Sequence, residues 1–334
     1  MMHASYQHES VRLTGRWDTR DPNAATTTTT GAYVEFAFEG RMALVHFDIL
    51  TNMTPYLHLW VQLDGGDMVE TSIDSHLRIM AKTDGKHICR IIYKGGAEKD
   101  RRWYLPLTGK VSFVGVQAEK LIPIEPDTRP VIEFVGDSIT EGVLIDVDFA
   151  DGFDCDASYK DQDQRRFQDD VCATYAWQTA EALDLRPVVM GYGAVGTTHG
   201  GQGKVPAAAV AYPYNFQGSP ITHAPSKYVL INHGANDRGR PVEQYLQTYA
   251  ELLDVVRAYN PNATVIALSA FCGAHHAALG EMIAQYNEKN GCHVYFIDSN
   301  GWVSPEPLHP LRDGHTTVAE HLIPLLREIV KANP

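Results

Sequence analysis

The sequence changes abruptly from apolar to small and polar residues within the stretch 131–142. Val131 to Val135 is mostly apolar, and Gly136-Asp137-Ser138 then interrupts the run. This pattern predicts a buried strand that ends where the chain turns into a helix. A serine in this position lies at the carboxyl end of a strand, where open α/β sheets bind their ligands. Asp137 and Ser138 also belong to residue types that cap helices, so this stretch alone fits capping and catalysis equally well.

Short apolar runs alternate with amphipathic segments from this stretch to the end of the chain. Such alternation predicts an α/β domain with three layers and a mainly parallel sheet. Its functional side chains should gather at the carboxyl ends of the strands. The expected strands cover residues 131–135, 187–190, 227–232, 264–270 and 293–298, and the expected helices cover residues 170–183, 242–259, 279–290 and 317–331.

The first third of the chain has a different period. Between residues 12 and 119, apolar and polar residues alternate in segments such as 33–39, and glycine, aspartate and asparagine punctuate them. A period of two with frequent turns predicts a β-sandwich. The segment 121–130 is dense in proline and predicts a linker. We therefore expect an all-β sandwich domain at residues 1–126 and an α/β domain at residues 127–334, and we interpret the threonine run 26–30 as a loop.

Three tryptophans of the sandwich segment allow two interpretations. Trp17, Trp60 and Trp103 could stack on sugar rings, because an aromatic face suits them, or they could pack in the core. Large aromatic side chains are highly buried on average. We therefore favour packing.

The charge balance disfavours two classes of partner. The chain carries 28 basic and 41 acidic residues, which gives a formal net charge of −13. Nucleic acids and anionic membranes attract basic surfaces, so we expect neither as a partner. The five cysteines have no paired spacing, so we expect neither a disulfide framework nor a Cys-x-x-Cys metal site.

The N-terminus gives an expectation about location. The first ten residues have no basic segment followed by an apolar one, and no later run of about 18 apolar residues could span a bilayer. We expect a cytoplasmic protein, although a secreted protein whose signal had been removed would look the same. An N-terminal sandwich is often an oligomer contact, so homo-oligomerisation stays open.

A glycine block at residues 191–196 follows the second expected strand. Its pattern, Gly-x-Gly-x-x-Gly, also occurs in dinucleotide-binding folds. Those folds need a helix directly after the block and an acidic residue about 20 positions later, and this chain offers neither, so we expect no cofactor. Glycines at a strand end also let backbone N–H groups approach a ligand, as an oxyanion hole requires.

Two further blocks supply polar groups at strand ends. Asn236 can donate an amide N–H to a developing oxyanion, whereas Asp237 could cap the next helix or brace the loop. His309 precedes the last expected helix and could take a proton from Ser138, with Glu306 three residues earlier to orient its ring. The alternative for Asn236-Asp237 is a plain turn. For any one of 15 histidines it is a surface or capping role.

The order of these blocks resembles the SGNH (GDSL-type) hydrolases over residues 130–334. The resembling blocks are Gly136-Asp137-Ser138, the glycines at 191–196, Gly234-Ala-Asn236-Asp237 and Glu306-x-x-His309-Pro310. A β-sandwich ahead of them further resembles carbohydrate esterase family two, whose members deacetylate plant polysaccharides. This resemblance implies a flavodoxin-like catalytic domain behind a jelly-roll domain.

The resemblance implies a role for each matching residue. Ser138 would be the nucleophile and His309 the general base, oriented by Glu306 or by a backbone carbonyl, because the usual aspartate is a glutamate here. The oxyanion hole would consist of the N–H groups of Ser138 and a block-two glycine together with the amide of Asn236. We expect Gly196 for that glycine, with Gly193 as the second choice. The expected supporting residues are Asp137, Asp237 and Trp302, the last as a wall of the site or a packing residue.

Three other features are weaker candidates. Asp313-Gly-His315 competes with the block at His309. The acidic run Asp146, Asp148, Asp151, Asp154 and Asp156 lacks the order of a calcium loop, and we interpret it as a solvated insertion. His199 and the pair His275-His276 lack the spacing of a zinc site, so we expect no metal.

Together these features predict a metal-independent serine esterase. The expected substrate is an acetylated carbohydrate such as xylan or xylo-oligosaccharide, and the expected reaction removes its acetyl group. Two alternatives stay open: an esterase or lipase of the same fold that acts on other esters, and a carbohydrate-binding protein with a degenerate hydrolase domain.

Overall fold

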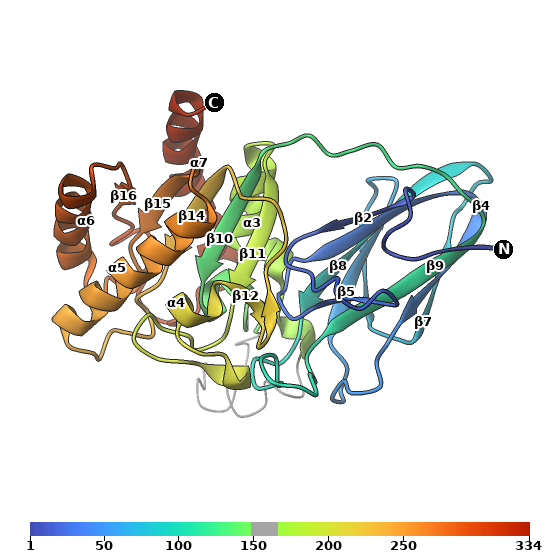
Figure 1. The fold of residues 1–334 in the computed structure, drawn as a ribbon, viewed down its shortest axis with the longest axis horizontal. Coiled ribbons are helices and arrows are strands. Elements are labelled where there is room, and N and C mark those ends of the chain that lie inside the picture. The colour runs from blue at the N-terminus through green and yellow to red at the C-terminus, as the bar shows by residue number, and fades with distance from the viewer. Residues whose placement is uncertain (148–165) are drawn as a thin grey trace.

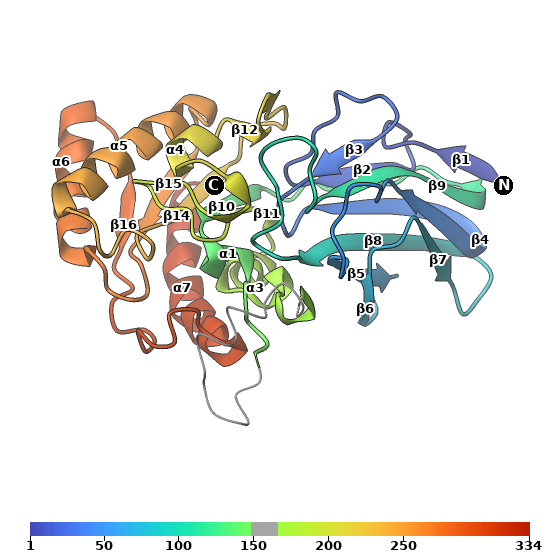
Figure 2. The same ribbon diagram turned by 90° about the horizontal axis from the view of Figure 1, so that it is seen from below.

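The computed structural model describes residues 1–147 and 166–334, which form an α/β domain and an all-β domain side by side (Figure 1). Figure 2 shows the molecule from below: helices lie on both sides of the sheet of the α/β domain, and the β-sandwich lies beside β11. This arrangement confirms the predicted fold class, an α/β domain behind a jelly-roll-like sandwich.

The α/β domain is built on a five-stranded parallel sheet with the order β11-β10-β14-β15-β16. Each strand lies at a segment where the sequence predicted one. The register pairs Gly136 at the end of β10 with Gly191 at the end of β11 and with Asn232 at the end of β14. The three blocks with candidate functional residues therefore begin at the carboxyl ends of neighbouring strands. The strands are β10 (Val131–Gly136), β11 (Arg186–Gly191), β14 (Tyr228–Asn232), β15 (Thr264–Leu268) and β16 (Tyr295–Ile297).

Helices cover both faces of this sheet. Side chains of β14 and β15 point alternately to the two faces, so that Ile231 packs in the core under α4, α5 and α6, while Leu230 packs in the core under α3 and α7. The helices are α1 (Ser138–Glu141), α3 (Tyr175–Ala182), α4 (Ala208–Ala211), α5 (Val242–Tyr259), α6 (His276–Asn290) and α7 (Arg312–Ala332). Short 3₁₀ helices occur at Arg166–Gln168, Val171–Ala173 and Gln202–Lys204, and β12 (Tyr214–Phe216) pairs with β13 (Ser219–Pro220).

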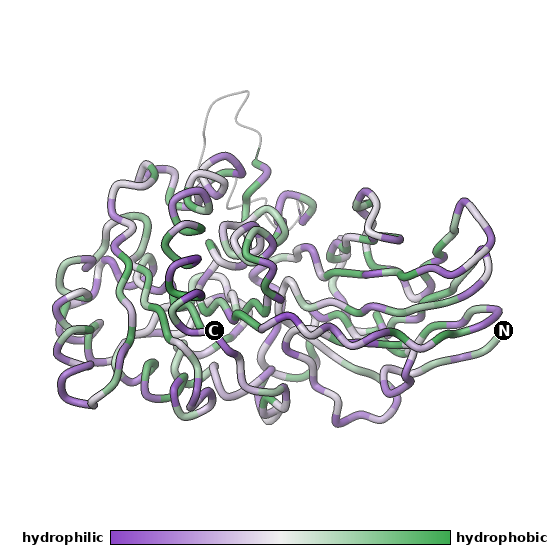
Figure 3. The backbone as a smooth tube through the Cα atoms, turned by 90° about the horizontal axis from the view of Figure 1, so that it is seen from above, coloured by the Kyte–Doolittle hydropathy of each residue, from purple (hydrophilic) through white to green (hydrophobic). Residues whose placement is uncertain are grey.

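The N-terminal domain is an antiparallel sandwich in which one long strand joins both layers. The first half of β4 pairs with β2 and β8, and its second half pairs with β7 and β9, although β9 also pairs with Phe38 and Glu39. The change of partner occurs at Gly40, whose φ of 115° is a backbone conformation that glycine adopts more readily than other residues. Figure 3 shows purple and green residues alternating along these strands. The strands are β1 (Met2–Ala4), β2 (Val11–Thr14), β3 (Ala25–Thr27), β4 (Tyr33–Phe47), β5 (His58–Leu63), β6 (Met68–Ser72), β7 (His76–Met80), β8 (Lys86–Gly95) and β9 (Val111–Leu121).

The two domains are joined by buried polar contacts as well as by the chain. No strand or helix covers residues 122–130 between β9 and β10, and the division at residue 126 stays a prediction. Arg16 of the sandwich places Nη2 2.7 Å from Oε1 of Glu133 in β10, and both side chains are fully buried. Tyr212 donates its hydroxyl proton to the other oxygen of Glu133 at 2.6 Å. The sandwich is therefore fixed against the parallel sheet.

Residues 26–30 differ from the expected loop. Thr26 and Thr27 belong to β3, and the whole run is buried or nearly so. Thr28 Oγ1 lies 3.0 Å from the hydroxyl of Tyr192, and Thr30 donates to the carbonyl of Glu141 at 3.1 Å. The threonines lie at the domain interface because their hydroxyls satisfy polar groups of the α/β domain there.

The tryptophans of the sandwich pack as expected. Trp17 lies in the sandwich core, Trp103 enters the core of the α/β domain, and Trp60 donates its indole N–H to Asp170 at 2.9 Å. Within residues 1–147 and 166–334, no helix combines the length and the apolar character needed to cross a membrane.

Candidate active site

Ser138 and His309 meet at the carboxyl end of the parallel sheet. Ser138 is the first residue of α1, and its Oγ lies 2.7 Å from Nε2 of His309 in the loop before α7. Asp137 caps the helix by accepting the N–H of Ile139 at 3.0 Å. Because Asp137 fills the capping role, the hydroxyl of Ser138 is left to pair with the imidazole.

The burial of His309 suits it to accept a proton. Its side chain is 8% exposed. Burial, together with the positive charge of Arg238, lowers the pKa of His309 to about 4. The imidazole is therefore neutral at neutral pH, so its Nε2 can accept the proton of Ser138.

The backbone beside Ser138 favours Gly193 over Gly196 as the second oxyanion donor. Gly196 donates its N–H to the carbonyl of His199 at 3.1 Å, so this group is already used. Among the described residues, no acceptor pairs with the N–H of Gly193 or with that of Ser138. Gly193 follows the end of β11 by two residues, just as Ser138 follows the end of β10. The order of preference given by the sequence is therefore reversed.

Asn236 lies at the same end of the sheet, where its side-chain amide donates to two acceptors. Its Nδ2 donates to Oδ2 of Asp137 at 3.1 Å and to the carbonyl of Val195 at 3.2 Å. Burial, together with the nearby Asp237 carboxylate, raises the pKa of Asp137 to about 7, although the hydrogen bond from the Ile139 N–H opposes them. Asp137 thus links α1 to the side-chain amide of Asn236. The predicted closeness of Ser138, Asn236 and a block-two glycine agrees with this geometry, whereas their catalytic roles stay predictions.

Asp237 braces the block-two loop rather than capping α5. Its carboxylate accepts the backbone N–H of Thr197 at 3.0 Å and that of Thr198 at 2.9 Å. These hydrogen bonds lower the pKa of Asp237 even though burial opposes them. The N-cap position of α5 is Pro241, which makes no side-chain cap. Of the two roles considered for Asp237, the structure supports the bracing one.

Glu306 is not brought to His309. The glutamate side chain is exposed, and no hydrogen bond or ion pair between it and His309 exists in the described part of the chain. The backbone explains this placement: Ser304 Oγ accepts the N–H of Glu306 at 3.2 Å and donates to its carbonyl at 2.6 Å, which forms a local turn on the surface. The expectation that Glu306 orients His309 is therefore not supported.

Neither competing residue of the last block contacts Ser138. His315 is buried in α7, where its Nδ1 accepts the N–H of Tyr175 at 3.2 Å, and its ring stacks on the ring of Tyr175. Asp313 is exposed. Trp302 stacks on His321 of α7 with ring centroids 5.2 Å apart and lines a surface pocket together with Glu306. These contacts favour the packing interpretation of Trp302.

Two residues of the sandwich reach the carboxyl end of the parallel sheet, and the sequence analysis predicted neither of them. Arg102 is buried and pairs with both carboxylate oxygens of Glu141, the last residue of α1. Glu98 packs its carboxyl against Gly193. No local pattern could have found these pairings, because each residue joins the site from a loop of the other domain.

The described residues contain no group of three or more His, Cys, Asp or Glu that could hold a metal ion. Of the acidic run, Asp146 forms an ion pair with Arg312 at 2.6 Å. The predicted insertion at Asp148, Asp151, Asp154 and Asp156 lies outside the described residues.

A serine and a neutral histidine in hydrogen-bond contact, beside backbone and amide N–H donors, define a serine-hydrolase type of site. The model of the GDSL-like Lipase/Acylhydrolase family matches residues 134–317, a segment that contains Ser138, Gly193, Asn236 and His309. The chain belongs to this family, as the sequence blocks predicted.

Known proteins share the whole two-domain arrangement. A protein of Cellvibrio japonicus (strain Ueda107), described as acetylxylan esterase / glucomannan deacetylase, is 23% identical over 297 residues, which cover 80% of this chain and 78% of that protein. The structure of a family two carbohydrate esterase from Clostridium thermocellum in complex with cellohexaose has a TM-score of 0.77 at 22% identity and covers 96% of this chain and 99% of that one. A family two carbohydrate esterase from Cellvibrio japonicus has a TM-score of 0.80 at 18% identity, with 99% and 98% covered.

Proposed function

We propose that the protein is a serine esterase that removes acetyl groups from carbohydrate, such as acetylated xylan or xylo-oligosaccharides. The observation that carries this proposal is the 2.7 Å contact between Ser138 Oγ and His309 Nε2. Membership of the acylhydrolase family supports the reaction class. The substrate class is supported by relatives that are described as acetylxylan esterase and carbohydrate esterase.

In the first half of the reaction, Ser138 Oγ attacks the carbonyl carbon of the acetyl ester while its proton passes to Nε2 of His309. The oxygen that gains negative charge accepts hydrogen bonds from the backbone N–H groups of Ser138 and Gly193. Asn236 adds a third when its Nδ2 turns one hydrogen from Asp137 or Val195 to this oxygen. His309 then gives its proton to the departing sugar oxygen, which leaves acetyl-Ser138. In the second half, water gives a proton to His309 and attacks the acetyl carbon, and acetate leaves as Ser138 regains its proton.

The test compares wild type with Ser138→Ala and His309→Ala on p-nitrophenyl acetate and on acetylated xylan. Loss of the nucleophile or the base is expected to lower kcat by about 10³-fold or more, with unchanged circular dichroism and Tm within a few degrees. Equal activity of wild type and Ser138→Ala would overturn the mechanism.

Two other functions of the same fold are separated by the same assay. An esterase or lipase for larger acyl groups would hydrolyse p-nitrophenyl butyrate or octanoate faster than the acetate. A carbohydrate-binding protein with a degenerate hydrolase domain would bind xylo-oligosaccharide without releasing acetate. We favour the acetylesterase because Ser138 and His309 are positioned to react.

A further inference from the structure

A loop of the β-sandwich enters the α/β domain beside the candidate active site. This loop, residues 96–110, connects β8 to β9 and reaches toward β11 (Figure 2). Its backbone is bonded to the other domain, since Arg102 donates its N–H to Gly203 at 3.1 Å and Trp103 accepts the N–H of Gln217 at 3.0 Å. The indole of Trp103 packs in the α/β core. The loop is therefore held firmly against the catalytic domain.

Glu98 in this loop lies against the oxyanion-hole glycine. A Cβ atom at Gly193 would be 2.3 Å from Oε2 of Glu98 and 2.5 Å from its Cβ, so the glutamate side chain occupies the space next to the Gly193 Cα. Gly136 at the end of β10 pairs with Gly191 at the end of β11, and Ser138 and Gly193 each follow two residues later, so both lie at the carboxyl end of the sheet. Glu98 thus lies beside the expected oxyanion hole, although it comes from the other domain.

Among the buried glutamates that the structure describes, Glu98 differs in that no side chain or backbone group of the described residues bonds to its carboxyl. Its side chain is 3% exposed, and no hydrogen bond or ion pair to it exists within residues 1–147 and 166–334. In contrast, Glu35, Glu133 and Glu141 are also buried, and each forms an ion pair with an arginine. Neither carboxyl oxygen is among the fully shielded atoms that lack a partner, so the carboxyl keeps a small opening through which a ligand can donate a hydrogen bond.

The surroundings of Glu98 fit a hydroxyl ligand. Burial, together with the neighbouring carboxylates of Glu141 and Asp137, raises the pKa of Glu98 to about 7, although the positive charge of Arg102 opposes them. Near neutral pH the group therefore exists both as a carboxylic acid and as a carboxylate. A sugar hydroxyl can donate to the carboxylate and accept from the acid, so it suits both forms. An aryl leaving group such as p-nitrophenol offers no such neighbouring hydroxyl.

We propose that Glu98 binds a hydroxyl of the sugar that carries the acetyl group, and that the N-terminal domain in this way supplies a specificity-determining residue to the active site. This inference rests on the proposed carbohydrate esterase function. The rigid loop holds Glu98 in place before substrate arrives, which reduces the entropy lost on binding.

The test measures kcat/KM on acetylated xylobiose and on p-nitrophenyl acetate for wild type, Glu98→Ala and Glu98→Gln. The ratio of the two kcat/KM values is expected to fall about 10- to 100-fold in Glu98→Ala, as for the loss of a hydrogen bond to a buried, partly charged group. Glu98→Gln keeps a donor and an acceptor, so it should restore most of the ratio. A ratio that stays within twofold of wild type in Glu98→Ala would overturn the proposal.

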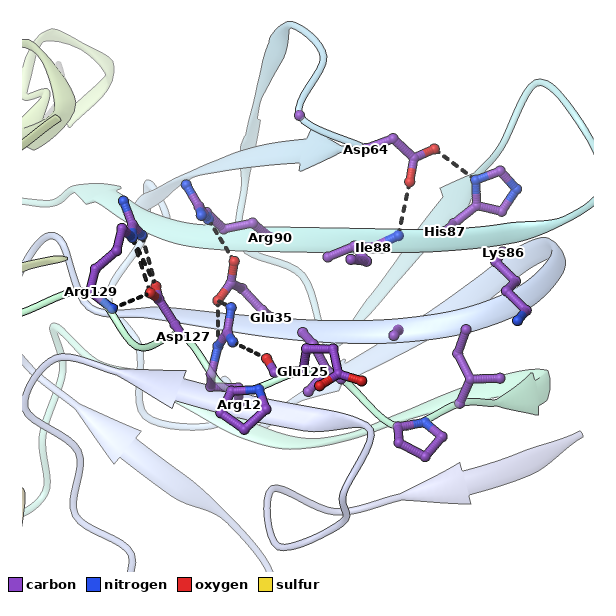
Figure 4. Close-up of a pocket in the computed structure, with 16 residues that line it drawn as sticks. Arg12, Glu35, Asp64, Lys86, His87, Ile88, Arg90, Glu125, Asp127 and Arg129 are labelled. Atoms are coloured by element: carbon purple, nitrogen blue, oxygen red, sulfur yellow. Dashed lines mark hydrogen bonds and ion pairs between the residues drawn. The ribbon is translucent and has the colours of Figure 1, made fainter. Parts of the chain in front are cut away.

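Thermal unfolding separates a binding role of Glu98 from a structural one. A structural role predicts that Glu98→Gln lowers the Tm, whereas the binding role predicts no fall. Glu98→Gln removes an unpaired buried acid and should keep or raise the Tm at pH 8. The matched control is Glu35→Gln: Glu35 is buried in the sandwich between Arg12 at 2.6 Å and Arg90 at 3.0 Å (Figure 4). This control should lower the Tm and leave the substrate ratio unchanged. A fall in the Tm of Glu98→Gln as large as that of Glu35→Gln would assign Glu98 a structural role and overturn the proposal.

Failure of the underlying function gives a different result. Wild-type protein that hydrolyses p-nitrophenyl acetate but not acetylated xylobiose would overturn the carbohydrate substrate and the role of Glu98 together. Wild-type protein that hydrolyses both, with an unchanged ratio in Glu98→Ala, would overturn the role of Glu98 alone.

Discussion

Arg102 of the β-sandwich holds both carboxylate oxygens of Glu141, the residue that ends the helix begun by Ser138. Both side chains are 1% exposed, and the guanidinium Nη2 lies 3.3 Å from Oε2. The planar guanidinium matches the carboxylate in a two-point contact that fixes distance and direction. A residue of one domain therefore fixes the helix that carries the candidate nucleophile of the other.

The first prediction concerns this pair. Arg102→Met leaves Glu141 buried without a partner and is expected to lower the free energy of unfolding by about 3–5 kcal/mol. The double variant Arg102→Met, Glu141→Met should regain most of that stability, because neither charge is then left alone. We expect its kcat on p-nitrophenyl acetate to stay at least about tenfold below wild type, since α1 is no longer held. Urea unfolding and steady-state kinetics measure the two effects, and a double variant with wild-type kcat would show that the clamp serves stability alone.

Sequence periodicity predicted the strands and helices well, because both produce local patterns of apolar and polar residues. The expected helix 242–259 has the same bounds as α5, and each strand of the parallel sheet lies at an expected segment. The closeness of Ser138 and His309 followed from the rule that functional groups gather at strand ends. The pattern could not show which glycine N–H is free, since this depends on the turn in which Gly196 bonds to His199.

The errors have a common physical cause, which is that side-chain direction in loops depends on contacts far apart in the sequence. Glu306 precedes His309 by three residues, but the turn at Ser304 leaves it exposed. Arg102 and Glu141 are 39 positions apart, and nothing in either local pattern links them. Thr28 and Thr30 looked like loop residues because their buried partners belong to the other domain.

The second prediction separates Glu306 from His309. Glu306→Gln is expected to change kcat/KM on p-nitrophenyl acetate by less than about threefold, because the glutamate is exposed and does not contact the imidazole. His309→Asn, which keeps a polar side chain of smaller size, should lower kcat by about 10³-fold or more. Assay of both variants at pH 8 decides the matter. A 100-fold loss in Glu306→Gln would restore the role expected from the sequence.

The third prediction concerns the stability of the protein in acid. Burial lowers the pKa of His315 to about 3, below the ordinary value of 6.5. The unfolded chain therefore binds a proton at this histidine between pH 3 and 6.5 while the folded chain does not, so this contribution to stability is complete above pH 6.5 and is lost as the pH falls. Between pH 6.5 and pH 5 the loss amounts to about 1.5 kcal/mol.

His315→Gln tests this contribution, because the glutamine oxygen can accept the N–H of Tyr175 without titrating. The difference in unfolding free energy between pH 6.5 and pH 5, measured with urea, should be smaller in the variant by about 1.5 kcal/mol. His321→Gln is a suitable control, since that histidine lies at the surface against Trp302. An equal pH dependence in wild type and His315→Gln would mean that folding does not lower the pKa of His315 and would contradict the prediction.

The last prediction assigns Asn236 to the transition state rather than to substrate binding. Its Nδ2 donates one hydrogen to Asp137 and the other to Val195, which holds the amide beside Ser138, and one of these two hydrogens must turn to the oxyanion as it forms. Asn236→Ala removes a donor that becomes stronger only as negative charge develops. We therefore expect kcat on p-nitrophenyl acetate to fall about 10²- to 10³-fold with KM changed by less than about threefold. A rise in KM at constant kcat would instead show that Asn236 binds the ground state of the substrate.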